Sequence, residues 1–302
     1  MRPLVSVVCV AFNNPQPVLH LVTTLQRQTY DKVEVIVVDN SQNDDLRKYL
    51  ARKCLVRGPI TRLTYVPNEN TGYAGGNVRG VVYSHGAFIF ILNPDTTLRA
   101  TTIEVLVNKF LKSPERVMVL VPKIMISNTR TINSIGMKRM HVGENVYVNI
   151  GHLERDNGQY DRENKLEAFD GSAFMFKREL LTHTYLFDPR FFFGHETTDL
   201  AERLIKNGFE IRSCPRAVVQ HDVRGTVTTK KVNNRMNVLL VRNLLIHTLK
   251  NMGWGMFFRT LWIGICYRNV VWPIATRNDN WRWSFTYMKG IARFALDIGR
   301  LS

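Results

Sequence analysis

Two carboxylates in this sequence directly follow apolar runs. Asp95 comes after the run Phe88–Leu92 and the turn Asn93-Pro94. Proline cannot donate a hydrogen bond to a sheet ladder, so the pattern predicts a buried strand that ends before Asp95. Ligands of open α/β sheets bind at the carboxyl ends of strands, and a carboxylate there suits a divalent cation that bridges phosphates. The alternative is a turn carboxylate that merely follows proline.

Asp39 follows a second apolar run, Val33–Val38. At the end of a strand, its carboxylate could accept a hydrogen bond from a ribose hydroxyl or from the N–H of a pyrimidine base. The alternative is that Asp39 caps a helix predicted over Asp44–Ala51, since aspartate is a favoured N-cap residue.

Glu196 and Asp199 fall in the first turn of a predicted helix that ends at Asn207-Gly208. They share one side of that helix, at the end where the helix dipole favours negative charge. Carboxylates at a helix N-terminus usually serve as caps.

Four glycines, Gly72, Gly75, Gly76 and Gly80, lie within nine residues at the start of another predicted helix. Glycine allows a backbone to approach a ligand closely or to adopt a positive φ. A glycine-rich loop that opens a helix is a natural phosphate site, although this stretch matches neither G-x-G-x-x-G nor the P-loop. A helix that starts close to its neighbours would need glycines too.

The elements that position these residues follow from apolar periodicity. Leu4–Ala11 and Val33–Val38 are predicted as buried strands on either side of a helix that carries Val18 and Leu25 on its apolar face. Strand, helix and strand in that order predict a parallel pair with a right-handed crossover. Residues 127–165 predict hairpins and an irregular loop. The other predicted strands are Leu63–Val66, Phe88–Leu92, Val117–Val121, Phe169–Phe176, Ile211–Cys214 and Val218–His221.

In order and spacing, these motifs resemble those of the inverting glycosyltransferases of family 2, in particular the rhamnosyltransferase-like branch. The resemblance covers roughly residues 4–225. It implies the GT-A nucleotide-diphospho-sugar transferase fold, an α/β fold with a mostly parallel central sheet flanked by helices. The matching stretches are Phe12–Asn14, Val38–Ser41, Asn70–Asn77, Leu92–Asp95, Asp170–Ala173, Glu196–Leu200 and His221.

The resemblance also implies a function: transfer of a sugar from a nucleotide-diphosphate donor, such as dTDP-rhamnose or a UDP-sugar, to a hydroxyl of a glycan or lipid-linked acceptor. Asp95 and His221 would hold Mg²⁺ or Mn²⁺ on the diphosphate. Glu196 or Asp199 would be the base, with Glu196 the first candidate, and Asp170 would orient sugar hydroxyls. The implied donor-binding residues are Phe12, Asn13, Asn14, Asp39, Asn70, Gly72, Gly75, Gly76, Asn77 and Asn93.

Two positions depart from the pattern of the family. Thr197 stands where the branch carries the aspartate that acts as base, and Val78 replaces the second asparagine of the glycine loop. A threonine cannot act as a general base, so a catalytically inactive scaffold is one alternative function. A nucleotidyltransferase is another, but it would carry a basic phosphate-binding motif near the first loop, and residues 11–15 contain none.

The C-terminal stretch has a composition of its own. The 302-residue chain has a formal net charge of +16, and from Lys230 onward twelve Lys or Arg against two Asp account for +10 of it, together with all five tryptophans. Aromatic and basic residues with few acids are typical of a segment in a membrane interface. The sequence therefore predicts a glycosyltransferase domain over 1–225 and a basic, Trp-rich, helical, membrane-associating region over 226–302. A helical subdomain packed on the core is the alternative for the second region.

Composition limits the remaining possibilities. A hydrophobic content of 45% supports a sizeable core. The charge alone would suit nucleic acid, but no groove-reading element is apparent, so no nucleic-acid partner is expected. The four cysteines form no C-x-x-C pair, and no apolar run reaches 18 residues. These features predict a cytoplasmic protein that is peripheral on the inner face of the membrane, and they leave its oligomeric state open.

Overall fold

The structure, a computed structural model, describes residues 2–51, 55–142, 144–223, 230–265 and 281–298. Within these ranges the chain forms a ten-stranded sheet ordered β10-β12-β6-β11-β4-β1-β2-β3, with β5 paired to β12 and β7 paired to β6. β8 and β9 form a separate hairpin, in the region where the sequence predicted hairpins. The strands are β1 (Val5–Ala11), β2 (Val33–Asp39), β3 (Ile60–Pro67), β4 (Phe88–Leu92), β5 (Thr96–Leu98), β6 (Val117–Ile126), β7 (Ile132–Ser134), β8 (Met137–Val142), β9 (Glu144–Asn149), β10 (Lys165–Leu166), β11 (Ala173–Lys177) and β12 (Glu210–His221).

Parallel pairing defines the half of the sheet that carries the predicted strand ends. β1 pairs in parallel with both β2 and β4, and β2 pairs in parallel with β3. β11 runs antiparallel between β4 and β6, so the sheet is mixed. Ala11 lies opposite Asp39, and Asp39 lies opposite Pro67. The carboxyl ends of β1, β2 and β3 are therefore level at one edge of the sheet.

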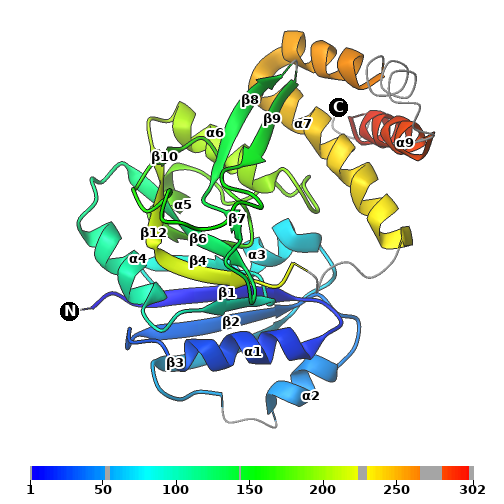
Figure 1. Cartoon of the computed structure of the whole chain (residues 1–302). Coiled ribbons are helices and arrows are strands. Elements are labelled where there is room, and N and C mark those ends of the chain that lie inside the picture. Colours follow the sequence, from blue (N-terminus) through cyan, green and yellow to red (C-terminus); the bar gives the residue numbers. More distant parts are fainter. Residues whose placement is uncertain (1, 52–54, 143, 224–229, 266–280, 299–302) are drawn as a thin grey trace.

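Alternation along the strands sorts the helices into two layers, so that helices flank the sheet as the sequence predicted (Figure 1). Val5, Val7 and Cys9 of β1 face a core that includes side chains of α1, α2 and α4, whereas Val8 faces a second core with α3, α6 and α7. Successive side chains of a strand point to opposite faces, so one buried strand supplies both layers. The helices are α1 (Pro15–Leu25), α2 (Asp45–Ala51), α3 (Gly72–Val82), α4 (Thr102–Leu111), α5 (Leu180–His183), α6 (Glu196–Lys206), α7 (Lys230–Trp262) and α9 (Trp281–Ile298).

Several predicted strand bounds differ from the structure. The strand predicted from Phe169 begins only at Ala173, as β11, because residues 171–172 form a turn. Ile211–Cys214 and Val218–His221 belong to one strand, β12, because a bulge between Cys214 and Val218 carries the backbone past Pro215 without leaving the sheet. The strand predicted over Val117–Val121 continues as β6 to Ile126, where it remains paired with β12.

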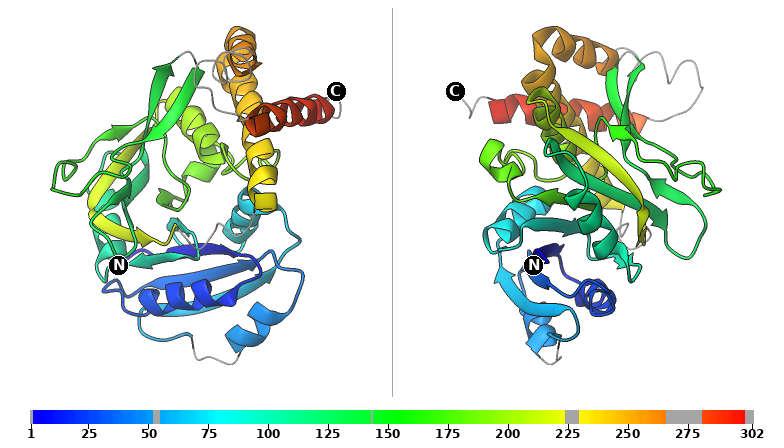
Figure 2. Two further views of the ribbon diagram at one scale, coloured as in Figure 1. Left: turned by 45° about the vertical axis from the view of Figure 1, so that its right-hand side comes forward. Right: turned by 90° about the vertical axis from the view of Figure 1, so that its left-hand side faces the viewer.

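In its described residues, the C-terminal region forms two long helices. Non-helical backbone at Gly253, with φ 80° and ψ 176°, bends α7 into two parts. α7 contacts α6, β9 and α9, and both views of Figure 2 show it running along the part of the molecule that carries α6. Packing on the core, one of the two alternatives for this region, therefore describes α7. The predicted boundary at 225 lies outside the described residues, and so does Trp272, one of the five tryptophans.

In the described part of the chain, no helix combines the length and the apolar character needed to span a bilayer.

Gly80 allows α3 to lie close to the sheet. A Cβ atom at this position would be 2.4 Å from Val8 Cγ1 and 3.0 Å from Val38 Cγ2. We expect Gly80→Ala to lower the free energy of unfolding, measured by urea denaturation, by about 1–3 kcal/mol, the usual cost of overpacking a core. Gly255→Ala is the matched control, because a Cβ atom there meets nothing within 4 Å and alanine stabilises a helix relative to glycine. Equal effects of the two substitutions would contradict the packing role.

Candidate active site

The end of β2 opens into a polar groove of about 490 Å³, lined by residues that follow β2 and β3. Asp39 lies in its wall, where the Tyr65 hydroxyl donates a hydrogen bond to Oδ2 and the Ser41 N–H donates one to Oδ1, both at 2.9 Å. Burial, and then the hydrogen bond to Asp39 and its charge, raise the pKa of Tyr65 to about 12, so the phenol remains a donor. Asp39 does not cap α2, because the N–H of Asp45 is bound by Asn43 instead.

In the turn after β1, Asn13 and Asn14 form hydrogen bonds within the protein, whereas the Phe12 side chain is exposed to solvent. Asn13 adopts a left-handed conformation with φ 58°, and its N–H donates to Ser41 Oγ at 2.7 Å. Asn14 Oδ1 accepts from the Gln16 N–H at 3.1 Å and caps α1. The Phe12 side chain is exposed. Of the three residues predicted to bind the donor, Asn14 is thus engaged in helix capping.

The glycines predicted to open a helix as a phosphate site lie in α3, where an added Cβ atom would meet protein atoms. Gly72 has φ +74°, and a Cβ atom there would meet the Phe192 carbonyl oxygen at 2.2 Å. Cβ atoms at Gly75 and Gly76 would approach neighbouring side chains to 2.5 and 2.7 Å. These glycines therefore serve close packing within the protein. The local sequence cannot distinguish that need from close approach to a ligand.

Asparagine side chains fasten the start of α3 to the ends of β2 and β3. Asn70 Oδ1 accepts from the Gly72 N–H at 3.1 Å, and Asn40 Nδ2 donates to the Gly72 carbonyl at 2.9 Å. Asn68 Nδ2 donates to Asn40 Oδ1 at 2.8 Å. Sequence reasoning did not include Asn40 and Asn68 among the site residues, although the position of Asn40 directly after Asp39 is a signal for it.

Asp95 and His221 face each other across the turn that follows β4. His221 Nε2 lies 3.2 Å from Asp95 Oδ1, and the two side chains are 12% and 14% exposed. The pairing of β5 with β12, in which Thr96 lies opposite His221, brings them together. Burial lowers the pKa of His221, but the hydrogen bond and charge of Asp95 outweigh it, so the pKa is raised overall.

The donor atoms of this pair fit a divalent cation on a diphosphate. Carboxylate oxygens suit Mg²⁺ and Mn²⁺, and Mg²⁺ sites commonly use one or two protein ligands while substrate phosphates and water supply the rest. The described ranges contain no site built from protein ligands alone, that is, no group of three or more His, Cys, Asp or Glu side chains that could hold a metal.

The turn before β11 reaches the same edge of the sheet. Asp170 Oδ1 accepts from the Ser172 N–H at 2.8 Å, and the Ser172 carbonyl accepts from the Asn93 N–H at 2.9 Å. The Tyr73 hydroxyl donates to the carbonyl of the residue after Asp170. Asn77 is buried, and its Nδ2 donates to the Tyr73 carbonyl at 2.9 Å. α3 therefore holds the Asp170 turn beside the end of β4.

Glu196 begins α6 with a buried carboxylate. Burial, and further the charge of Asp170, raise its pKa to about 7, although backbone hydrogen bonds from Glu196 itself and from Gly194 act in the opposite direction. Within the described chain its Oε2 atom has no hydrogen-bond partner. Thr197 is buried next to it, and a Cβ atom at Gly171 would lie 3.4 Å from Thr197 Cγ2.

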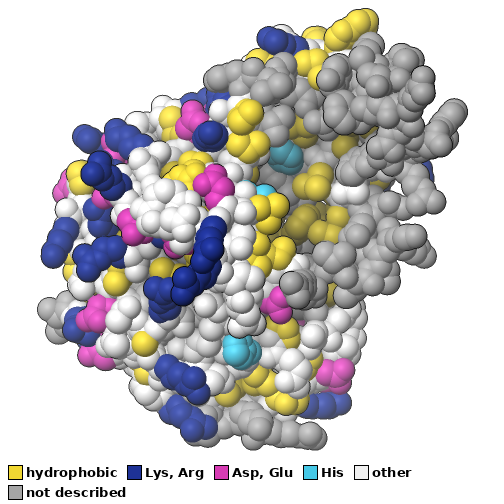
Figure 3. All heavy atoms as spheres, viewed as in Figure 1, with side chains coloured by type: hydrophobic (Ala, Val, Ile, Leu, Met, Phe, Trp, Pro, Cys, Tyr) yellow, Lys and Arg dark blue, Asp and Glu magenta, His cyan; other side chains and the backbone are white. Residues whose placement is uncertain are grey.

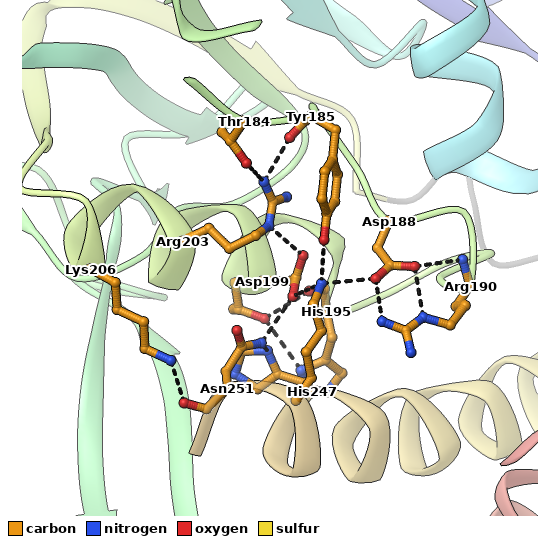
Figure 4. A network of polar contacts seen from close by, with 12 residues as sticks. Thr184, Tyr185, Asp188, Arg190, His195, Asp199, Arg203, Lys206, His247 and Asn251 are labelled. Carbon is orange, nitrogen blue, oxygen red and sulfur yellow. Dashed lines mark hydrogen bonds and ion pairs between the residues drawn. The ribbon is translucent and has the colours of Figure 1, made fainter. Parts of the chain in front are cut away.

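Asp199 lies in a different environment from Glu196, within the network of polar contacts that Figure 4 shows. It is fully buried. Its Oδ2 accepts from Arg203 Nε at 2.9 Å, while Oδ1 accepts from Asn251 Nδ2 at 2.9 Å and lies 2.7 Å from Lys250 Nζ. Both carboxylate oxygens are thus engaged by donors of α6 and α7, in an ion-pair network that joins the two helices.

Comparison with known protein families gives one matching family model, which covers most of the strands of the central sheet. The model of glycosyl transferase family 2 matches residues 6–184, more than half of the 302 residues. Comparison with curated protein sequences gives no significant match.

Solved structures of glycosyltransferases share the fold. GalNAc-T7, solved with UDP, GalNAc and Mn²⁺, superimposes with a TM-score of 0.64 at 15% identity over 98% of this chain, which spans only 58% of GalNAc-T7. The mannosyltransferase PcManGT from Pyrobaculum calidifontis, in complex with GDP-Man and Mn²⁺, gives 0.59 at 16% identity over 98% of this chain and 88% of that one. S. aureus TarS 1–349 in complex with UDP gives 0.55 at 13% identity over 88% and 73%.

At these identities, likeness to the solved structures establishes the fold, and the family match establishes kinship. Together they show that this chain belongs to glycosyl transferase family 2 and is a glycosyltransferase with the GT-A fold.

Proposed function

We propose that the chain transfers a sugar from a nucleoside-diphosphate donor to a hydroxyl of its acceptor, with inversion at the anomeric carbon and Glu196 as general base. The observation that carries this proposal is the buried Glu196 carboxylate, whose Oε2 has no hydrogen-bond partner in the described chain and whose pKa is raised to about 7 by burial. A base with a pKa near the working pH is both substantially ionised and able to retain a proton.

In the proposed step, Glu196 accepts the proton of the acceptor hydroxyl while the hydroxyl oxygen attacks the anomeric carbon. The new carbon–oxygen bond forms on the face opposite the leaving group. The bond from the anomeric carbon to the diphosphate breaks, and its electron pair leaves with the nucleoside diphosphate. Asp170, whose Oδ1 is fixed by the Ser172 N–H, is proposed to orient sugar hydroxyls.

The groove at Asp39 is the proposed nucleotide site. Its carboxylate accepts from the Tyr65 hydroxyl and the Ser41 N–H, so its position is fixed before a ligand binds. Such a carboxylate can accept from a pyrimidine N–H or a ribose hydroxyl, which supports a UDP-sugar or dTDP-rhamnose as donor. The exposed Phe12 side chain and the polar turn at Asn93 are proposed to contribute to the same site.

Asp95 and His221 are proposed to hold Mg²⁺ or Mn²⁺ on the diphosphate. When bound there, the ion would offset the negative charge that develops on the departing diphosphate. The 3.2 Å separation of Asp95 Oδ1 and His221 Nε2 supports this assignment, because it brings the two donor atoms within reach of one ion at the end of β4.

Asp95→Ala should remove metal-dependent binding of the diphosphate. In calorimetry with Mn²⁺, we expect UDP affinity to fall to the level measured with a chelator, while the affinity for uridine is unchanged because the Asp39 groove is intact. Asp31→Ala, which removes a carboxylate from the loop before β2, is the control and should bind UDP normally. Unchanged Mn²⁺-dependent UDP affinity in Asp95→Ala would show that the assignment is wrong.

Glu196→Gln should lower turnover by roughly 10²–10⁴-fold, the usual worth of a general base, without loss of donor affinity. In the unaltered chain, kcat/KM should fall as the pH is lowered through about 7, because the base becomes protonated. In Glu196→Gln that acid limb should disappear. Asp199→Asn is the comparison: it should lower the melting temperature, keep the acid limb, and lower turnover far less than Glu196→Gln does, since Asp199 is held in ion pairs.

Near-normal turnover in Glu196→Gln would remove this mechanism. Absence of turnover in the unaltered chain with every nucleotide sugar of a broad panel would instead favour an inactive scaffold, the alternative that Thr197 suggests.

We further propose that the C-terminal region binds an anionic membrane surface and presents the enzyme to a glycan or lipid-linked acceptor on the cytoplasmic side. After Gly253, the side chains of Trp254, Phe258 and Trp262 are 63%, 58% and 69% exposed. Their four-residue spacing places them on one face of α7. Phe257 lies on another face and packs against Phe294 of α9, with 5.3 Å between the ring centroids. The excess of basic residues in this region complements anionic lipid.

A hollow beside the C-terminal region would suit the acceptor. Figure 3 shows hydrophobic side chains and histidine gathered there, on the part of the molecule where α7 meets the sheet domain. An acceptor with an apolar portion would reach this hollow from a surface bound by α7.

Replacing Trp254 and Trp262 together by alanine should reduce cosedimentation with vesicles that contain anionic lipid, because the exposed aromatic face supplies buried apolar area. Leu111→Ala is the control, since Leu111 is a comparably exposed apolar residue at 62% on α4. Salt should release the unaltered chain only in part, because screening weakens basic contacts but not apolar burial. No vesicle binding by the unaltered chain would contradict the proposal and leave the transferase assignment intact.

A further inference from the structure

The segment that precedes Glu196 is held by the start of α3. The Tyr73 N–H donates to the Phe192 carbonyl at 2.9 Å. A side chain at position 72 would collide with the same carbonyl oxygen, so glycine is needed there. The path of the chain toward Glu196 therefore depends on the element that also holds the Asp170 turn.

A buried asparagine of α7 holds the next two residues of that segment. Asn243 is fully buried, and its Nδ2 donates to the carbonyls of Phe193 and Gly194, both at 2.9 Å. Its Oδ1 accepts from Arg242 Nη1 at 2.6 Å. A guanidinium can only donate, so this contact fixes which end of the amide faces the two carbonyls.

α7 also packs directly against the same turn. Gly194 has φ +86°, and a Cβ atom there would lie 2.3 Å from Leu240 Cδ2. The close approach of α7 leaves Gly194 as the residue that fits both the backbone conformation and the space.

Two further residues of α7 hold α6 on the other side of Glu196. Lys250 Nζ lies 2.7 Å from Asp199 Oδ1, and Asn251 Nδ2 donates to the same oxygen at 2.9 Å. Figure 4 shows Asn251 of α7 beside Asp199 and Arg203 of α6 in one network of polar contacts. Glu196 therefore lies between two points at which α7 is attached.

We propose that Asn243 is a positioning residue of the active site, and that α7 is a working part of the catalytic centre. This inference rests on the proposed role of Glu196 as base. The two hydrogen bonds from Asn243 set the orientation of the peptide groups immediately before α6 and so the direction in which Glu196 enters the site. Displacement of a catalytic group by about 1 Å can lower a rate by about 10²-fold.

The test is Asn243→Ala in the full chain, assayed by release of UDP from a UDP-sugar with Mn²⁺. We expect kcat to fall by about 10- to 10²-fold, as misplacement of a base would cause, while the donor KM and the calorimetric UDP affinity stay within about twofold of the unaltered values. The acid limb of kcat/KM should also move to lower pH. A loosened turn admits water to Glu196, and its pKa then falls toward the ordinary value, with Asp170 and Tyr73 as the ionisable groups that face it.

Thr248→Ala is the matched control on the same helix. Thr248 is also buried, but its hydroxyl donates to the Leu244 carbonyl within α7, so its loss weakens the helix without touching the Glu196 turn. Asn251→Ala, which removes one hydrogen bond to Asp199, provides a second test should Asn243→Ala fail to fold. It should lower kcat in the same direction by a smaller factor.

The outcomes separate this inference from the proposed function. If Glu196→Gln loses turnover but Asn243→Ala and Asn251→Ala match Thr248→Ala in kcat and in pH profile, the positioning role is overturned and the base assignment survives. If Glu196→Gln keeps its turnover, both are overturned. A fall in kcat with an unshifted acid limb, equal to that of Thr248→Ala, would indicate general destabilisation and would also overturn the positioning role.

Discussion

Desolvation of a single carboxylate, Glu196, is the constraint on which the arrangement of the catalytic half depends. Its pKa is raised from 4.5 to about 7, which corresponds to about 3 kcal/mol in favour of the neutral form. Because the folded-state pKa lies above the unfolded one, the stability that Glu196 contributes is present below about pH 4.5 and is lost as the pH rises through about 7. At neutral pH, neighbouring contacts must therefore offset an acid held in an unfavourable environment.

The contacts that offset it have the opposite dependence on pH. Burial would raise the pKa of Asp188, but hydrogen bonds from Arg190 and Lys250 outweigh it and hold that pKa far below its ordinary value of 3.8. A depressed pKa contributes stability above the unfolded pKa and loses it on acidification. Lys250 joins this carboxylate to Asp199, so the network of α6 and α7 is intact over the pH range in which Glu196 is least favourable.

The placement of Asp39 and Asp95 at one edge of the sheet could be predicted from the sequence because its determinants are local. An apolar run and the turn that ends it place Asp39 and Asp95 at one edge of a sheet, whatever the rest of the chain does. The roles of the glycines could not be predicted, since Gly72 meets the carbonyl of Phe192, a residue far away in the sequence. Close packing and ligand approach both require glycine, and the sequence pattern is the same for each.

The surroundings of Glu196 and Asp199 depend on α7, and these contacts were beyond local patterns for the same reason. The position of Asp199 in the first turn of α6 is as compatible with a base as that of Glu196. What distinguishes the two is that Asp199 meets Lys250 and Asn251, whereas Glu196 Oε2 meets no donor in the described residues. Contacts with α7 therefore distinguish Asp199 from Glu196, although the sequence pattern of that helix suggested contact with a membrane surface.

Thr197 changes the electrostatic environment of Glu196. An aspartate there would place a second negative charge beside Glu196, and like charges raise a carboxyl pKa further. With threonine in its place, Asp170 supplies the nearby negative charge, while backbone N–H groups of Gly194 and Glu196 act against it. The Gly194 N–H belongs to the peptide group whose carbonyl, that of Phe193, accepts from Asn243. One of the backbone groups that lower the proton affinity of Glu196 is therefore part of a peptide group that α7 holds in place.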